Sequence, residues 1–188
     1  MKIQQILKAG SIIAATQQEQ LPEALASSAS AILLMYAKLT GLLEDAERFA
    51  QSPKPIFLHT DLMNGLSNDK ESLRFLSRHI RPAGIVSTKS HMIRVAKKEG
   101  MLTIQRIFLI DSSSLQTTIK NVLENQPDAI EIMPGIAPSI IPYIKEQLPQ
   151  PIILGGLIWS REQVREALAH GADAVSLSRS DLWNMTEK

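Results

Sequence analysis

The chain has 188 residues, a hydrophobic fraction of 44% and a net charge of +1, ordinary values for one globular domain that can bury a core. It contains no cysteine, which excludes disulfides and thiolate metal sites and suits a reducing cytosol. The first stretch, MKIQQILKAGSIIAAT, is too polar and its apolar runs are too short for a signal peptide or a membrane span. We therefore expect one cytoplasmic domain over residues 1–188 that does not enter the membrane.

Short apolar runs alternate with helix-like segments along the whole chain. The predicted strands are 11–15, 31–36, 55–60, 84–87, one within 101–110, 128–132, 151–154 and 172–177. The predicted helices are 19–27, 41–51 with Thr40 as its N-cap, one capped by Ser67 or Asp69 that ends near His79, 89–99, one capped by Asp111 or Ser112 that ends near Asn125, 138–148, and 161–169. Pro142 falls inside 138–148, so that helix either begins later or is kinked there.

An alternation of strands and helices indicates parallel strands joined by right-handed crossovers. Eight such units of about 23 residues each favour closure into a barrel. We predict an α/β fold, a compact single-domain (β/α)8 barrel of the TIM type, smaller than the ~250 residues typical of that class. A doubly wound open sheet is the second choice.

Basic residues are concentrated between positions 70 and 106. This segment contains nine lysines and arginines but only two acidic residues, whereas acidic residues are in excess in the rest of the chain. A local excess of this size favours an anionic partner. Solvated helical faces that are simply rich in lysine and arginine explain the same composition, and both interpretations stay open.

In a barrel of this class, the polar residues that follow the strands face the active mouth. They are His59, Asp61, Asn64, Thr88, Lys89, Gln105, Arg106, Glu131, Gly155, Gly156, Ser176 and Ser178. Backbone N–H groups after the last two strands commonly hold a phosphate in such barrels. No HExxH, GxSxG, Walker or GxGxxG motif occurs, so no established catalytic chemistry or metal site is indicated.

Several of these residues have more than one interpretation. Lys89 can pair with a phosphate, act as a Schiff-base amine or be a plain exposed lysine. Glu131 can hold a ligand hydroxyl or form a structural ion pair inside the barrel, and Asp61 can bind hydroxyls or a cation or cap its loop. His59 is interpreted as an inward-facing histidine whose hydrogen bonds are satisfied.

Five runs in consistent order resemble the glycerol-3-phosphate-responsive antiterminator family. They are HTDLMNGL from His59, GIVSTKS from Gly84, LTIQRIF from Leu102, DAIEIMPG from Asp128 and GGLI from Gly155. Ala174-Val175-Ser176 and Leu182-Trp183 also fit, whereas Asn64 and Leu177 depart from the family pattern. The similarity spans nearly the whole chain.

The resemblance implies a cytosolic bacterial regulator with a barrel-like fold, no cofactor and glycerol 3-phosphate as effector. It implies that the residues that line or support the ligand site are Asp61, Lys89, Arg106, Glu131, Gly155, Gly156 and Ser176. It further implies that the protein suppresses a terminator in the leader mRNA of glycerol-utilisation genes. Homo-oligomer formation and contact with RNA polymerase stay open.

If RNA binds, the basic segment offers its phosphates an electrostatic surface. The candidate RNA-binding residues are Arg74, Arg78, Arg81, Arg94, Lys97 and Lys98. Aromatic residues for base stacking are scarce there, since Phe75 is the only one in the segment. The alternative is a phosphate-binding barrel enzyme, a lyase, isomerase or prenyltransferase, that acts on a three-carbon phosphorylated substrate.

Overall fold

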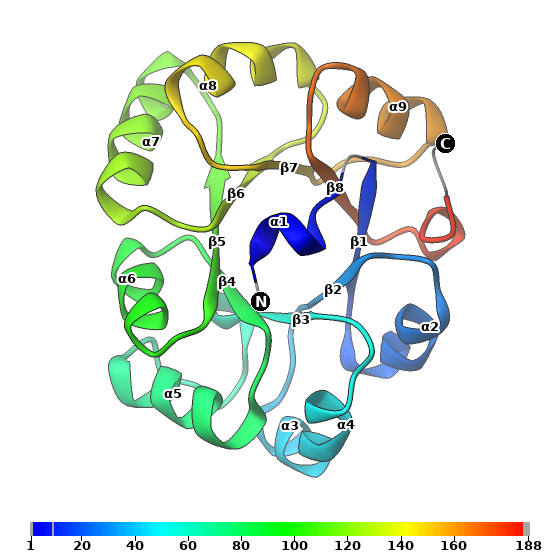
Figure 1. The fold of residues 1–188 in the computed structure, drawn as a ribbon, viewed down its shortest axis with the longest axis vertical. Helices are drawn as coiled ribbons and strands as arrows, with labels where there is room; N and C mark the ends of the chain where they lie inside the picture. The colour runs from blue at the N-terminus through cyan, green and yellow to red at the C-terminus, as the bar shows by residue number, and fades with distance from the viewer. Residues whose placement is uncertain (1, 9, 186–188) are drawn as a thin grey trace.

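Eight parallel strands close into a barrel in which each strand pairs with its neighbours in sequence (Figure 1). The computed structural model describes residues 2–8 and 10–185. The strands are β1 (Ser11–Thr16), β2 (Ala31–Leu34), β3 (Ile56–His59), β4 (Gly84–Ser87), β5 (Leu102–Phe108), β6 (Ala129–Met133), β7 (Ile152–Gly155) and β8 (Ala174–Leu177). Closure is made by β1, which pairs with β2 on one side and with β8 on the other, so that Ser11 faces Ala174. The predicted barrel is confirmed, and the open sheet is excluded.

A ring of helices covers the outside of the barrel (Figure 1). The helices of this ring are α2 (Leu21–Ala26), α3 (Leu39–Glu44), α4 (Ala46–Ala50), α5 (Lys70–Phe75), α6 (Ser90–Lys98), α7 (Ser112–Asn125), α8 (Ile141–Gln147) and α9 (Arg161–Ala169), while α1 (Ile3–Ile6) lies apart from it. Short 3-10 or π-helical turns are η1 (Gln18–Gln20), η2 (Thr60–Leu62), η3 (Leu76–Ile80), η4 (Pro138–Ile140) and η5 (Ser180–Leu182). None of the helices within the described ranges is long and apolar enough to cross a membrane.

Each strand is buried on both faces because it lies between the barrel interior and the helices. On β3, Phe57 belongs to the interior cluster, whereas Ile56 and Leu58 pack outward against the helices. The same alternation holds on the other strands, as expected from the period of two along a strand. Apolar side chains thus fill the part of the interior that lies toward the N-terminal ends of the strands.

The first helix closes the N-terminal end of the barrel. Ile3 and Ile6 are buried in the interior cluster together with Ala31, Ala129 and Ala174, which are the first residues of their strands. Figure 1 shows α1 lying over the centre of the ring. The sequence pattern did not predict this helix. Its apolar residues fill the bottom of the barrel, which leaves the other end for polar groups.

One further prediction is corrected, and one open alternative is decided. The expected helix 41–51 is divided into α3 and α4, and the residue at its N-cap position is Lys38, not Thr40, which lies inside α3. For the segment around Pro142, the first alternative is confirmed: α8 begins late, and Pro142 lies in its first turn, where its missing N–H costs nothing.

Candidate effector site at the barrel mouth

Polar side chains fill the C-terminal end of the barrel, above the apolar interior. Arg106 and Glu131 are cross-strand neighbours on β5 and β6, and Ser176 pairs in register with Gly155 on β8 and β7. Strand alternation places these residues two positions beyond Ile104, Ala129 and Ala174, which belong to the interior cluster. Local alternation and barrel closure together therefore bring the three polar side chains inside.

The three side chains form a buried hydrogen-bonded chain. Arg106 Nε donates to Glu131 Oε2 at 2.7 Å, and Ser176 Oγ donates to Glu131 Oε1 at 2.5 Å. Glu131 is 1% exposed and Arg106 6%, so the ion pair lies in a low-dielectric interior. The Nη2 of Arg106 is buried and has no partner among the described residues. The site therefore holds a spare cationic donor next to a carboxylate that is already paired.

Gly155 is required for this arrangement. A Cβ at this position would lie 2.1 Å from Ser176 Oγ and 3.1 Å from Glu131 Oε1. Any side chain would therefore displace the hydroxyl that donates to Glu131. Gly156 follows with φ +75°, a left-handed conformation that favours glycine, and its carbonyl accepts from the Gly135 N–H at 2.8 Å.

His59, at the end of β3, is 2% exposed, and its Nδ1 has no partner among the described residues. The expectation of an inward-facing histidine is confirmed, but the expectation that its hydrogen bonds are satisfied is wrong. Burial and the charge of Arg106 lower the pKa of His59 to about 4, and the carboxylates of Asp61 and Glu131 oppose this shift only in part. His59 is therefore neutral at neutral pH.

Asp61 ties the loop after β3 to the loop after β4. Its Oδ1 accepts from Ser87 Oγ at 2.6 Å, and its Oδ2 accepts from the N–H and the hydroxyl of Thr88 at 2.7 and 2.8 Å. Burial by itself raises the pKa of Asp61, but the hydrogen bonds from Ser87 and Thr88 outweigh it, so the pKa lies below its usual value. Ser87 Oγ also accepts from the Lys89 N–H at 3.1 Å, which fixes the start of α6.

The structure brings Arg106, Glu131, Gly155 and Ser176 into direct contact or close approach. The other predicted site residues lie on neighbouring loops of the same end: Asp61 after β3, Lys89 after β4 and Gly156 after β7. Of the remaining strand-end residues, Gln105 belongs elsewhere, since it faces outward and accepts from Asn125.

The sequence analysis did not identify Ser87 as a partner of Asp61, nor the buried Nδ1 of His59 as an atom without a hydrogen-bond partner. Ser87 is the last residue of a buried strand, a position that the strand-end rule covers. The free nitrogen of His59 has no sequence signal, because it depends on what the other strands place around it.

A polar hollow of about 490 Å³ adjoins the mouth and reaches Arg106. It lies between the ends of β4 and β5 and the first turns of α7, and its lining includes Thr88, Asp111 and Thr117. Across the described part of the chain, no three His, Asp or Glu side chains gather in a way that could hold a metal ion. The chemistry available here is anion and hydroxyl binding by a guanidinium, hydroxyls and carboxylates.

The fold and the mouth define the class: a small TIM-type barrel with a buried, incompletely partnered charged cluster at the C-terminal ends of its strands. The particular family follows from sequence. Residues 11–183 match the family described as glycerol-3-phosphate responsive antiterminator, and the chain belongs to it. This family is regulatory, so the protein belongs to a family of regulators.

Three relatives are similar to the chain, and the two with solved structures are named as antiterminator or antiterminator-related proteins. The chain is 32% identical over its whole length to the uncharacterized protein YgcP of Escherichia coli (strain K12), of which the match covers 99%. It is 37% identical to the solved glycerol uptake operon antiterminator regulatory protein of Listeria monocytogenes, with a TM-score of 0.87 over 94% of this chain and 96% of that one. A glycerol uptake operon antiterminator-related protein of Thermotoga maritima is 28% identical, with a TM-score of 0.81 over 93% and 98% of the two chains.

Proposed function

We propose that this protein binds glycerol 3-phosphate at the barrel mouth and, in that state, binds the leader mRNA of glycerol-utilisation genes and suppresses a terminator there. Membership of the family supports glycerol 3-phosphate as the effector. The buried Nη2 of Arg106, which has no partner among the described residues, is the main observation that supports the barrel mouth as its binding site. A buried guanidinium donor without a partner is costly in the free protein and is satisfied by an anion. Pairing of this donor with the phosphate therefore favours binding of the effector.

In this proposal, Arg106 takes the phosphate, with Lys89 and backbone N–H groups near Gly155 and Gly156 adding donors. Glu131 accepts from a glycerol hydroxyl, since each of its oxygens receives only one hydrogen bond from the described residues. Asp61 has a positioning role, because its three hydrogen bonds already hold the β3 and β4 loops together.

RNA binds, we propose, to the basic surface at the C-terminal ends of α5 with η3 and of α6. Helices in this fold run antiparallel to the strands, so these ends lie at the N-terminal end of the barrel, opposite the mouth. Arg78, Arg81 and Lys98 are exposed and have no ion pair within the described residues. Their charges are free to meet RNA phosphates.

The other three candidate residues are partly engaged in the protein. Arg74 is paired with Glu71 at 2.6 Å and Glu99 at 3.0 Å. Arg94 donates to the Asn125 side chain at 2.6 Å, and Lys97 Nζ donates to the carbonyl of Gln126. Lys97 and Arg94 keep their charge, because their partners are neutral, whereas the charge of Arg74 is neutralised.

The test is a titration of labelled leader RNA at fixed moderate salt, with and without glycerol 3-phosphate. We expect tighter RNA binding with the effector, and Arg106→Ala is expected to abolish the response while leaving basal RNA binding intact. Equal RNA binding with and without the effector would refute the proposed control. Sedimentation of the same samples and a pull-down with RNA polymerase test the homo-oligomer and the polymerase contact.

A further inference from the structure

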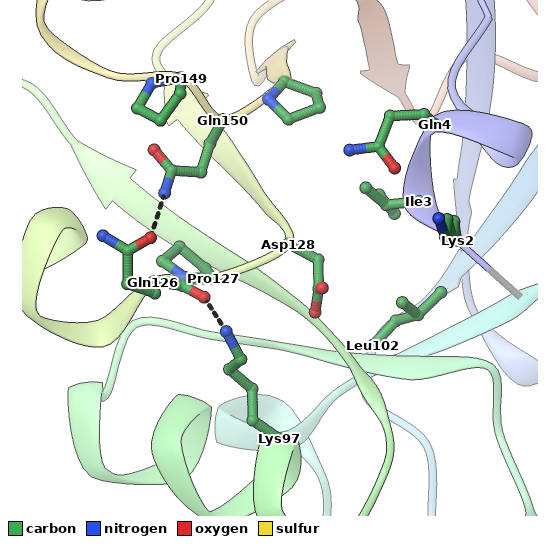
Figure 2. Close-up of a pocket in the computed structure, with 11 residues that line it drawn as sticks. Lys2, Ile3, Gln4, Lys97, Leu102, Gln126, Pro127, Asp128, Pro149 and Gln150 are labelled. Atoms are coloured by element: carbon green, nitrogen blue, oxygen red, sulfur yellow. Dashed lines mark hydrogen bonds between the residues drawn. The ribbon is translucent and has the colours of Figure 1, made fainter.

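Three buried polar side-chain atoms have no hydrogen-bond partner among the described residues. One is Oε1 of Gln150, at the N-terminal end of the barrel, whose amide lies beside that of Gln126 (Figure 2). The other two are Nη2 of Arg106 and Nδ1 of His59, whose side chains enter the barrel from the C-terminal parts of β5 and β3. A buried donor or acceptor without a partner destabilises the fold, so two of them at one mouth indicate a ligand that pairs with both.

The register of the strands places His59 and Arg106 in the same layer of the barrel. Strand pairing leads from His59 across β4 to Ile104 on β5, and Arg106 lies two residues further along β5 on the same side. The same step, repeated around the barrel, leads to Gly155 on β7, to Ala15 on β1 and back to His59. Inward-facing residues of alternate strands form such layers of four in barrels of this class. Since Ala15 carries only a methyl group and Gly155 no side chain, all polar side-chain atoms of this layer belong to His59 and Arg106.

A ligand for this polar layer has to enter from the mouth. The layer beneath it consists of Leu33, Val86, Glu131 and Ser176, and the void that these side chains line is too small to hold a water molecule. On the mouth side, Met35 packs against the interior cluster, and Met133 Cε would lie 3.3 Å from a Cβ at Gly155. Methionine side chains are flexible, so these two can move aside for a ligand that reaches His59 and Arg106.

The charges that act on His59 come from Arg106 on β5, Asp61 in the turn after β3 and Glu131 on β6, whereas the inward side chains of β1, β2 and β4 carry no charge. In the free protein, burial and the charge of Arg106 lower the pKa of His59 to about 4. Glu131 already balances the charge of Arg106, so a phosphate that binds here adds negative charge that the interior does not yet compensate. That added charge raises the pKa of His59 and favours the imidazolium, which donates from both ring nitrogens.

We propose that His59 is a second contact for the phosphate of the effector, beside Arg106, and that the effector binds with uptake of a proton by this imidazole. The inference rests on the proposed function and adds a binding residue and a proton to the same site. The proton comes from solvent and lies between the imidazole and a phosphate oxygen. Both unpartnered side chains of the layer then donate to one anion, and the imidazolium offsets the charge that the phosphate brings into the barrel.

The direct test is the titration of the histidine rings by NMR, with and without saturating glycerol 3-phosphate. The chain has four histidines, and the signal of His59 is the one that is missing from the spectrum of His59→Gln. We expect the pKa of His59 to rise from about 4 toward its ordinary value of 6.5 when the effector binds. Inorganic phosphate is expected to shift it in the same direction. A shift caused by glycerol and not by inorganic phosphate would overturn the phosphate contact.

Calorimetry at about pH 8 and about pH 6 measures the effect on affinity. A full rise of the pKa to about 6.5 strengthens effector binding about fourfold between these two pH values. The phosphate of the effector itself titrates near pH 6, so the quantity to compare is the difference between the wild type and His59→Gln, which keeps a donor but takes up no proton.

Two further variants separate the donor from the proton. His59→Leu removes the donor as well, and we expect it to bind the effector about tenfold or more weakly at both pH values. His170→Gln is the matched control, because the ring of His170 bonds to the Glu166 carbonyl at the C-terminal end of α9, away from the mouth. It is expected to bind as the wild type does. Melting temperatures identify any variant that is unfolded.

The possible failures are distinguishable. If the wild type binds no glycerol 3-phosphate, the proposed function fails. If the wild type binds it and Arg106→Ala does not, but His59→Leu matches the wild type and the pKa of His59 stays at about 4 in the complex, the inference about His59 is wrong and the proposed function stands.

Discussion

At the residue scale, the geometry of the mouth depends on the side chains of Arg106, Glu131 and Ser176. They are packed so tightly that they have no room to rearrange. Glu131 receives one hydrogen bond from each side, and the glycine next to it has no space for a methyl group. The buried ion pair is costly to desolvate, and it is retained in a barrel that apolar residues could fill.

Gly155→Ala tests the close approach at the mouth. The new methyl group collides with Ser176 Oγ, so we expect a loss of stability of about 1–3 kcal/mol, as for other overpacked cores. We also expect loss of glycerol 3-phosphate binding, measured by calorimetry. Gly100→Ala is the control, because its φ of +78° is strained but its Cβ meets nothing within 4 Å. That variant should lose about 1 kcal/mol and bind the effector normally. Normal effector binding by Gly155→Ala would contradict the proposed site.

His59 gives the molecule a pH dependence whose sign follows from its lowered pKa. The folded protein holds this histidine neutral down to about pH 4, whereas the unfolded chain takes up a proton near pH 6.5. Its contribution to stability is therefore complete above that higher pH and is lost as the pH falls between the two values. From about pH 7 to about pH 5 we expect a loss of about 2 kcal/mol in the free energy of unfolding.

Urea unfolding at several pH values measures this loss. His59→Gln is expected to flatten the pH dependence over that interval. An unaltered slope in His59→Gln would show that another group is responsible.

At the element scale, the charge that the sequence places on α5 and α6 divides into two classes. Arg74 is held between Glu71 and Glu99, which cancels its charge, whereas Arg78 and Lys98 project from the C-terminal ends of the same helical pair. A basic segment in the sequence is therefore not the same as a basic surface in the fold.

Arg74→Ala is expected to leave the salt dependence of RNA binding nearly unchanged. Arg78→Ala and Lys98→Ala should each lower the slope of log K against log salt by about 1, because each removes one phosphate contact. Titrations at four salt concentrations measure the slopes. An effect of Arg74→Ala as large as that of Lys98→Ala would place RNA on the exposed side of α5.

At the scale of the whole molecule, the mouth and the basic surface lie at opposite ends of one closed barrel. The N-terminal end is plugged by the apolar residues of α1, so in our proposal an effector bound at the mouth would not contact RNA bound at the far end. Coupling between the two sites must pass through the strands and helices that connect them.

Linkage requires that this coupling be reciprocal. If the effector tightens RNA binding by a given factor, RNA must tighten effector binding by the same factor, typically about 5–150-fold. Calorimetric titration of glycerol 3-phosphate into the protein, with and without saturating leader RNA, measures it. Unequal factors would show that the effector changes assembly or a second site as well.

The sequence alone determined the architecture and the inventory of the site. Strand and helix patterns depend on neighbouring residues, so their alternation predicted eight units and placed Arg106, Glu131 and Ser176 at strand ends. Only the tertiary structure decided which of these groups pair and which stay open. The Arg106–Glu131–Ser176 chain, the free atoms of His59 and Gln150 and the neutralised Arg74 all depend on contacts between residues distant in sequence. Barrel closure and strand register set those contacts, and no local pattern encodes them.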